Sequence, residues 1–329
     1  DLAVVAKHAD RIAVMREGEI VETGPTQRVL TERQHPYTKM LFAAATHQVD
    51  LPPAPDGAPL IEARDLRRSY RLPRKSLLER PGFFEALRGV SLSIARGERV
   101  GLVGESGCGK STLTRVLLGL DPVQAGSVTM GDHAIGDGKA TGREARRHMQ
   151  VVFQDPFGSF NPRHKVERLI TEPYHLLDTA PTGTERDRAV AEALTAVGLR
   201  ETDAGRYIHE FSGGQRQRIA IARALIIRPD LIIFDEAVSA LDVSVRAQIL
   251  DLLAELCRGH ALTYLFISHD LSVVRTVTDR VMVMQEGSIV EEGPTERVFT
   301  NPQHSYTKRL VAAVPRLELS TPKGLDDRA

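Results

Sequence analysis

Hydrophobic and polar residues alternate along two stretches in the first third of the chain, Leu60–Tyr70 and Ala86–Ile94. Alternation with a period of two is typical of strands with one buried face, so these stretches predict an antiparallel sheet. Short runs of mostly apolar residues follow at Arg99–Gly104, Met149–Gln154, Leu231–Asp235 and Leu262–Ser268. Continuous apolar runs favour parallel strands that are buried on both faces.

The run at Arg99–Gly104 leads through a glycine-rich loop into a predicted helix over Lys110–Leu120. This strand-loop-helix order is the unit from which parallel α/β sheets are built. A long, mostly helical interval separates Gln154 from Leu231. The pattern as a whole therefore predicts an α/β fold: a core with a parallel sheet, an antiparallel β subdomain and an inserted helical subdomain.

The chain also repeats itself at a distance of 269 positions. Residues 1–44 match residues 270–313 with 27 identities and no gap, from DLAVV against DLSVV to HPYTK against HSYTK. Amphipathic patterns repeat in polarity and not in identity, so the match indicates a duplicated unit. The first copy predicts a helix, a strand at Arg11–Met15, a turn, a second strand and a short helix. We interpret residues 1–48 as the end of a first domain, which makes the chain a fragment of a tandem protein.

Four prolines and a glycine fall within the eleven residues Val49–Pro59, which predict a semi-stiff linker. A disordered end is the alternative interpretation of this stretch. Residues 60–315 then form one complete domain, and residues 316–329 form a tail.

Composition restricts the class of protein only loosely. Lys+Arg and Asp+Glu are both 43, so the formal net charge is zero and bulk electrostatics disfavour a nucleic-acid partner. Two cysteines, Cys108 and Cys257, are too few and too far apart for a disulfide framework or a zinc site. No stretch reaches the roughly 18 consecutive apolar residues of a membrane span, so a membrane role requires a partner.

Two motifs carry the chemistry. GESGCGKST at Gly104–Thr112 fits the phosphate-loop pattern, in which backbone amides surround phosphate oxygens while Lys110 supplies a cation and Ser111 a Mg²⁺ ligand. The predicted nucleotide-binding residues of this loop are Gly104, Glu105, Ser106, Gly107, Cys108, Gly109, Lys110, Ser111 and Thr112. The second motif, FSGGQRQRIAIARAL at Phe211–Leu225, offers a hydroxyl and exposed amides at a helix start to a second anion.

Together these motifs resemble the nucleotide-binding domain of ABC transporters, over roughly residues 58–315. The resemblance implies ATP and Mg²⁺ as cofactors and an ATP hydrolase activity. It identifies Ser212, Gly213, Gly214 and Gln215 as the signature that contacts the ATP held by a second domain.

The resemblance assigns further roles to single residues. Asp235, Gln154 and Ser111 would hold Mg²⁺, and Gln154 would also contact the attacking water. Glu236, in LIIFDEAVSALD, would be the general base. His269 would contact the γ-phosphate, Tyr70 would stack on adenine, and Asp242 would lie in the loop that crosses the dimer interface. Each of these residues in isolation has a structural alternative, such as a helix cap for an Asp-Glu pair or a capping role for a lone histidine.

The segments VFQDPFGSFNPR, EPYHL and HSYTKRLVAAVP are similar to the ATPases of oligopeptide and dipeptide importers, whose relatives also carry nickel and glutathione. The resemblance implies a subunit that powers import by ATP-driven dimerisation. Its partners would be a second ABC ATPase domain (fused or from a homodimer), integral-membrane permeases and, indirectly, an extracytoplasmic solute-binding protein. We expect no nucleic-acid partner and a peripheral position on the cytoplasmic face of the inner membrane.

Two alternative functions remain open at this point. A soluble ABC ATPase could act on nucleic acid or ribosomes, although the balanced charge and the lack of sustained heptads between Gln154 and Ser212 disfavour this. A nucleotide-sensing module without turnover would be expected to lack Glu236 or His269, and both are present.

Overall fold

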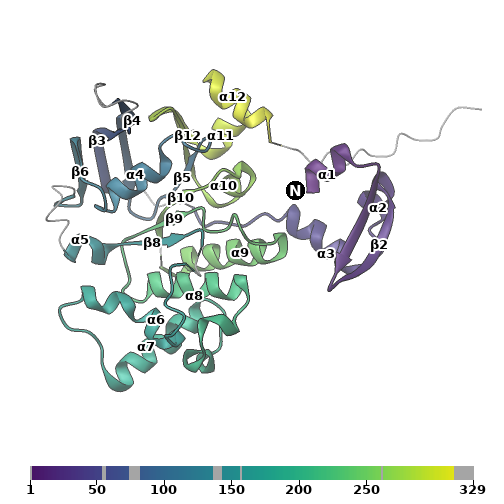
Figure 1. Cartoon of the computed structure of the whole chain (residues 1–329), viewed down its shortest axis with the longest axis horizontal. Helices are drawn as coiled ribbons and strands as arrows, with labels where there is room; N and C mark the ends of the chain where they lie inside the picture. Colours follow the sequence, from purple (N-terminus) through teal and green to yellow (C-terminus); the bar gives the residue numbers. More distant parts are fainter. Residues whose placement is uncertain are drawn as a thin grey trace, which may run out of the picture.

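The computed structural model describes residues 2–53, 57–73, 82–135, 143–155, 158–260 and 262–314. Outside the described residues lie most of residues 71–82, which connect the two predicted antiparallel strands, part of the predicted linker, and the predicted tail. Figure 1 shows a main body built around two sheets, with a helical lobe against it and a small N-terminal unit beside it.

A six-stranded sheet forms the centre of the main body. Its strands, in spatial order, are β12 (Ser288–Pro294), β11 (Arg280–Gln285), β5 (Arg99–Val103), β10 (Thr263–Ile267), β9 (Leu231–Asp235) and β8 (Met149–Phe153). All neighbours pair in parallel except β11 and β12, which are antiparallel. Every residue of β5 and β10 is buried, as the continuous apolar runs predict.

Alternate residues of these strands face two separate cores. Leu102, Ile233 and Ile267 belong to one core, together with α4 (Lys110–Leu117) and a second sheet. Phe234 and Phe266 belong to the other, which is closed by α8 (Gly213–Leu225), α9 (Val243–His260) and α10 (Leu271–Val277). The central sheet is thus covered on both faces, as a parallel sheet requires.

The second sheet is antiparallel, as predicted from the alternating stretches. Its strands, in spatial order, are β4 (Phe83–Ala95), β3 (Pro59–Arg71), β6 (Ala125–Met130) and β7 (His133–Ile135). The sequence predicted β3 and β4 to within three residues at each end, but not β6 or β7.

The helical lobe lies between β8 and β9 in the chain, as predicted. It contains α6 (Val166–Ile170), η1 (Glu172–Leu176), α7 (Gly183–Ala196), η2 (Glu201–Gly205), η3 (Ile208–Glu210) and α8. A short helix, α5 (Arg143–His148), precedes β8, and α11 (Thr295–Thr300) and α12 (Ser305–Ala312) follow β12. None of the described helices is both long and apolar enough to cross a bilayer.

The first copy of the repeat forms the N-terminal unit. It contains α1 (Leu2–His8), β1 (Arg11–Arg16), β2 (Glu19–Pro25), α2 (Thr26–Glu32) and α3 (Pro36–Ala45). Ile12, Val14 and Phe42 are central to its small core. The unit contacts the main body through α3 and α9, and the His47 Nε2 lies 2.6 Å from the Asp251 Oδ1. The second copy has the same elements built into the central sheet.

The two copies differ in what covers them. The strand β11 pairs with both β12 and β5, whereas the described residues provide β1 with β2 as its one neighbour. Met15 is 60% exposed, while its counterpart Met284 is fully buried. Val4 and Val5 are also exposed, and their counterparts Val273 and Val274 are buried. The first copy therefore presents to solvent an apolar face that the second copy buries.

Candidate nucleotide-binding site

The phosphate loop connects β5 to α4. A Cβ at Gly104 would lie 2.2 Å from the Met284 carbonyl oxygen, and one at Gly109 would lie 2.5 Å from the Ala86 carbonyl oxygen. Gly107 and Gly109 have φ values of +81° and +114°, which other residues rarely adopt. The backbone can close into this loop only because these three positions lack side chains.

Lys110 opens α4 and is 6% exposed. Its Nζ donates to the carbonyl oxygens of Gly104 at 2.7 Å and Glu105 at 2.9 Å. The ammonium group thus lies inside the loop, held by carbonyls that a phosphate group could replace. This is the position that the phosphate-loop motif predicts for its cation.

A cavity of about 570 Å³ lies where β8 and β9 end and α4 begins. Four of the predicted site residues line it: Ser111, Gln154, Asp235 and Glu236. They come from three separate segments between positions 111 and 236, and the parallel order of the strands brings them to one edge of the sheet. Asp155 and Ser159 also line this cavity.

Glu236 follows β9 with a left-handed φ of +52°. Its amide donates to the Ile267 carbonyl at 2.9 Å, and its own carbonyl accepts from the Ser239 hydroxyl at 2.8 Å. Its carboxylate lies 3.5 Å from the His269 Nδ1. A glutamate in this strained backbone region requires support from its surroundings, and such positions are concentrated at functional sites. The structure therefore brings Glu236 and His269 together.

Asp235 is half-buried at the end of β9. Burial raises the pKa of its carboxyl group, the neighbouring Glu236 raises it further, and the Lys110 ammonium lowers it. The net shift in the pKa is upward, chiefly because the carboxyl group is buried and secondarily because the Glu236 carboxylate is close to it. A cation placed between them would reverse this effect.

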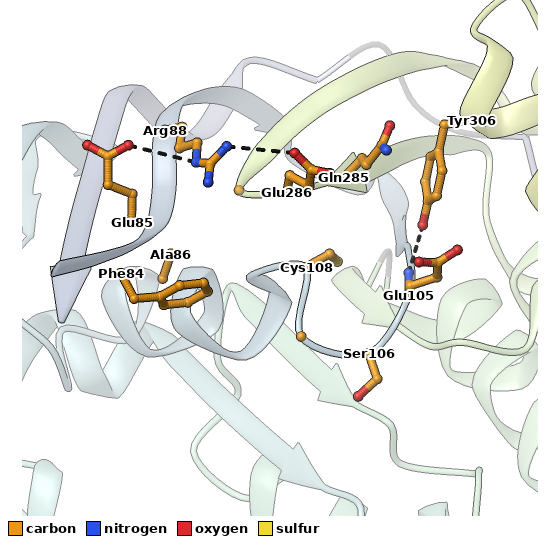
Figure 2. Close-up of a pocket in the computed structure, with 12 residues that line it drawn as sticks. Phe84, Glu85, Ala86, Arg88, Glu105, Ser106, Cys108, Gln285, Glu286 and Tyr306 are labelled. Atoms are coloured by element: carbon orange, nitrogen blue, oxygen red, sulfur yellow. Dashed lines mark hydrogen bonds and ion pairs between the residues drawn. The ribbon is translucent and has the colours of Figure 1, made fainter. Parts of the chain in front are cut away.

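A second, smaller cavity of about 190 Å³ lies between the phosphate loop, β4 and the β11–β12 turn. Figure 2 shows the Phe84 ring on one side of this cavity and the Tyr306 ring on the other. Ser106 and Cys108 from the phosphate loop also line it. Phe84 is 47% exposed, and the sequence analysis did not select it. The adjacent aromatic pair in GFFEAL was the available signal.

Tyr70 is not among the residues that line either cavity. Its hydroxyl donates to the Asp121 Oδ2 at 2.8 Å, and the Arg68 guanidinium lies 5.0 Å from its ring centre. Its cross-strand partner Phe84, rather than Tyr70 itself, lines the cavity beside the phosphate loop. The adenine-stacking role of Tyr70 remains a prediction.

The signature segment begins α8, on the helical lobe. Ser212 is the N-cap: its Oγ accepts from the Gln215 amide, and its own amide donates to the Gln215 Oε1 at 3.0 Å. Ser212 and Gly213 are exposed. A Cβ at Gly214 would lie 2.2 Å from the Val245 Cγ1, so this glycine permits the packing of α8 on α9. None of Ser212–Gln215 lines either cavity beside the phosphate loop.

Asp242 ends the loop before α9 and is exposed. Its Oδ1 accepts from the Val245 amide at 2.9 Å and the Ser244 hydroxyl at 2.7 Å. The structural role of this side chain is thus to cap α9, and its predicted contact with a second domain remains untested.

Comparison with known protein families gives a consistent result. The family model described as ABC transporter matches residues 87–239. This part of the chain belongs to the ABC transporter family. The model described as oligopeptide/dipeptide transporter, C-terminal region, matches residues 21–51 and again residues 290–326. The second model thus matches both copies of the repeat.

Two relatives cover almost the whole chain. The peptidoglycan transport ATP-binding protein YejF of Agrobacterium fabrum is 42% identical over 97% of this chain and 58% of its own length. The glutathione import ATP-binding protein GsiA of Escherichia coli K12 is 45% identical over 97% of this chain and 56% of its own length. The chain therefore spans little more than half the length of these relatives.

Solved ABC cassettes share the fold. The dimeric structure of MJ0796, a bacterial ABC transporter cassette, is 29% identical and has a TM-score of 0.61 over 71% of this chain and 98% of that chain. A post-hydrolysis state of MJ0796 bound to ADP and Pi is 27% identical, also with a TM-score of 0.61. These similarities confirm the predicted ABC cassette architecture.

Proposed function

We propose that this chain binds and hydrolyses ATP and that it does so between two ABC domains that close on the nucleotide. The sequence and fold of the ABC domain support this, as does the relationship to cassettes with a bound hydrolysis product. Lys110, whose ammonium group lies inside the loop, would hold the phosphates together with backbone amides of the loop.

The residues of the larger cavity fit a Mg²⁺ ion. Ser111, Gln154 and Asp235 offer a hydroxyl, an amide and a carboxylate at this cavity, and Mg²⁺ prefers such oxygen ligands. Mg²⁺ typically takes few protein ligands and completes its shell with water and phosphate oxygens. When bound there, the ion would neutralise the charge that develops on the phosphates.

Glu236 would act as the general base. Its carboxylate reaches the cavity and could accept a proton from an attacking water, while Gln154 could hold the same water. His269 lies beside the Glu236 carboxylate, where its imidazole could orient it. Each role requires only groups that the structure already brings to one edge of the sheet.

A single observation supports the use of two domains. The N-terminus of α8, which begins at the exposed N-cap residue Ser212, lies outside both cavities that border the phosphate loop of the same domain. A helix start that offers a hydroxyl and free amides attracts an anion, so it would act on the nucleotide of a facing domain. The dimeric MJ0796 cassette shows that this fold assembles in pairs.

The facing domain would be a cassette that precedes residues 1–48 in a longer protein, or a second copy of this chain. Two observations support the first possibility. In the second copy, β11 pairs with β5, so a preceding cassette could supply the corresponding strand beside β1. Such a strand would also cover the exposed apolar face that includes Met15. The duplicated match to the transporter C-terminal region gives the same indication.

The relatives named for peptidoglycan transport and glutathione import support a role in an importer for peptides or related solutes. Closing and opening of the pair would then drive membrane permeases that receive solute from an extracytoplasmic binding protein. The chain would then lie at the cytoplasmic face of the membrane. A soluble ATPase acting on nucleic acid or ribosomes is the alternative, and stimulation by permease rather than by DNA or ribosomes would separate them.

Glu236→Gln tests the proposal, because it keeps the shape of the side chain and removes the base. We expect hydrolysis to fall by about 10²-fold or more, while Mg·ATP binding persists and light scattering detects an ATP-dependent dimer. Glu255→Gln, at an exposed position on α9, is the matched control and should behave like the parent. Parental turnover by Glu236→Gln would refute the assignment of the base.

A further inference from the structure

The repeated segment HSYTK has no role in the proposed reaction, yet it contacts the phosphate loop. Tyr306 lies on α12 and is 3% exposed. Its hydroxyl oxygen accepts a hydrogen bond from the Glu105 amide at 2.9 Å, as Figure 2 shows. The two residues are 201 positions apart. The C-terminal region is therefore tied directly to the second residue of the loop.

Tyr306 holds the N–H of Glu105, and the C=O of Glu105 contacts the lysine that would bind the phosphates. The Glu105 carbonyl accepts from the Lys110 Nζ at 2.9 Å, so the residue is held on both its N–H and C=O sides. A phosphate in the loop would compete for the Lys110 ammonium. The Tyr306 hydroxyl would then be the remaining side-chain contact that keeps Glu105 in place.

A specific set of contacts positions the tyrosine. The Glu291 carboxylate of β12 accepts from the amides of Gln303 at 2.7 Å and His304 at 2.9 Å. The His304 Nδ1 in turn accepts from the Tyr306 amide at 3.2 Å, which caps α12. The start of α12 is therefore fixed to the central sheet, and Tyr306 is in its first turn.

The first copy of the repeat builds the same contacts. Glu22 accepts from the amides of Gln34 and His35, each at 3.0 Å, and the His35 Nδ1 accepts from the Tyr37 amide at 3.1 Å. Tyr37, at the position that matches Tyr306, is on the N-terminal unit, and the Arg16 guanidinium lies 5.3 Å from its ring centre. Tyr306 and Tyr37 thus have the same local contacts, but only Tyr306 contacts the phosphate loop among the described residues.

We propose that Tyr306 is a positioning residue for nucleotide binding: its hydroxyl holds the Glu105 amide so that the phosphate loop stays in its binding-competent shape. The inference rests on the proposed function and deepens it, since it assigns the C-terminal region a part in controlling nucleotide affinity. A ligand that binds one conformation of a loop loses apparent affinity in proportion to the fraction of molecules that leave it.

Tyr306→Phe removes the hydroxyl and keeps the ring. We expect the Kd for Mg·ATP and Mg·ADP to rise about fivefold, the size of one neutral hydrogen bond, by calorimetric titration of the whole chain. The KM for ATP should rise by a similar factor with kcat unchanged, because Glu236 and His269 are not disturbed. Tyr37→Phe is the matched control and should leave both constants at the parental values.

Hydrogen exchange without nucleotide gives an independent readout. The Glu105 amide should exchange at least several-fold faster in Tyr306→Phe than in the parent, with no change in Tyr37→Phe. If Tyr306→Phe does not fold, His304→Ala takes its place, because it removes the cap acceptor and leaves the tyrosine; His35→Ala is its control.

The outcomes separate the two proposals. A parent that does not bind Mg·ATP refutes the proposed function, while the exchange measurement still tests the link between Tyr306 and Glu105. A parent that binds, with Tyr306→Phe binding equally tightly, refutes the positioning role alone. Equal weakening by Tyr37→Phe would also overturn it, because the effect would then not depend on the phosphate loop.

Discussion

The matched methionines of the two repeats provide a direct test of the different surroundings of β1 and β11. Met15 and Met284 occupy the same position in the repeat, but Met15 is 60% exposed and Met284 is fully buried. Met284 packs in the core between the central sheet and the antiparallel sheet. Substitution by alanine therefore removes the same atoms from two different environments.

The expected costs follow from burial. Met284→Ala should lower the free energy of unfolding by about 2–5 kcal/mol, because it loses buried area and leaves a cavity. Met15→Ala should change it by no more than about 0.5 kcal/mol, as is usual for exposed positions. In a longer protein where a preceding cassette supplies a strand beside β1, the cost of Met15→Ala should rise toward that of Met284→Ala.

Native-state hydrogen exchange measures both costs in one chain, because it gives separate opening free energies for peptides from β1 and β11. Met284→Ala should lower protection in β11, and Met15→Ala should leave β1 nearly unchanged. A loss of several kcal/mol from Met15→Ala in this chain would show that the face is covered in solution. That result would refute the inference that β1 lacks a neighbouring strand that a preceding cassette could supply.

Two further predictions concern the phosphate loop and the antiparallel sheet. Lys110→Ala should weaken nucleotide binding, because it removes the only side-chain cation held inside the loop among the described residues; an unchanged ATP-dependent rise in Tm would contradict this. The Arg115 hydrogen bond, opposed by burial and aided by Tyr70, lowers the pKa of Asp121. The ionised Asp121 carboxylate therefore contributes its full stabilisation above pH 3.8, the ordinary pKa of an aspartate. This stabilisation is lost as the pH falls through the lower pKa of Asp121 in the folded state. Urea unfolding at a series of pH values should show a smaller acid loss for Asp121→Asn, and an identical loss would refute the link.

Much of the fold could be predicted because each of its elements has a local pattern. Buried parallel strands appear as apolar runs, so β9 was predicted to the residue and β5 and β8 to within one. The strands β6 and β7 were not predicted, since β6 is held by pairing with β3, far away in the chain, and β7 is held by pairing with β6. The helix α4 ends at Leu117 rather than Leu120, because Gly119 takes a φ of +62°.

The site shows the same division. The phosphate-loop motif predicted the position of Lys110, because the loop and its helix are contiguous in the chain. Tyr70, by contrast, lines neither cavity beside the loop. The hydrogen bond from Tyr70 to Asp121 depends on the contact between the end of β3 and the segment after α4, which no local sequence pattern predicts. Phe84 and Tyr306 could not be assigned to the loop for the same reason.

The sequence by itself determined the family, the phosphate loop and the duplication, because each is written in contiguous residues or in identities at one spacing. Only the tertiary structure decided which residues meet: Ser111 with Asp235 in one cavity, Glu236 with His269, and Tyr306 with Glu105. It also decided that two repeats with 27 identities in 44 residues have different surroundings. The physical reason is that burial and hydrogen bonding depend on neighbours in space, and parallel sheets bring those neighbours from distant parts of the chain.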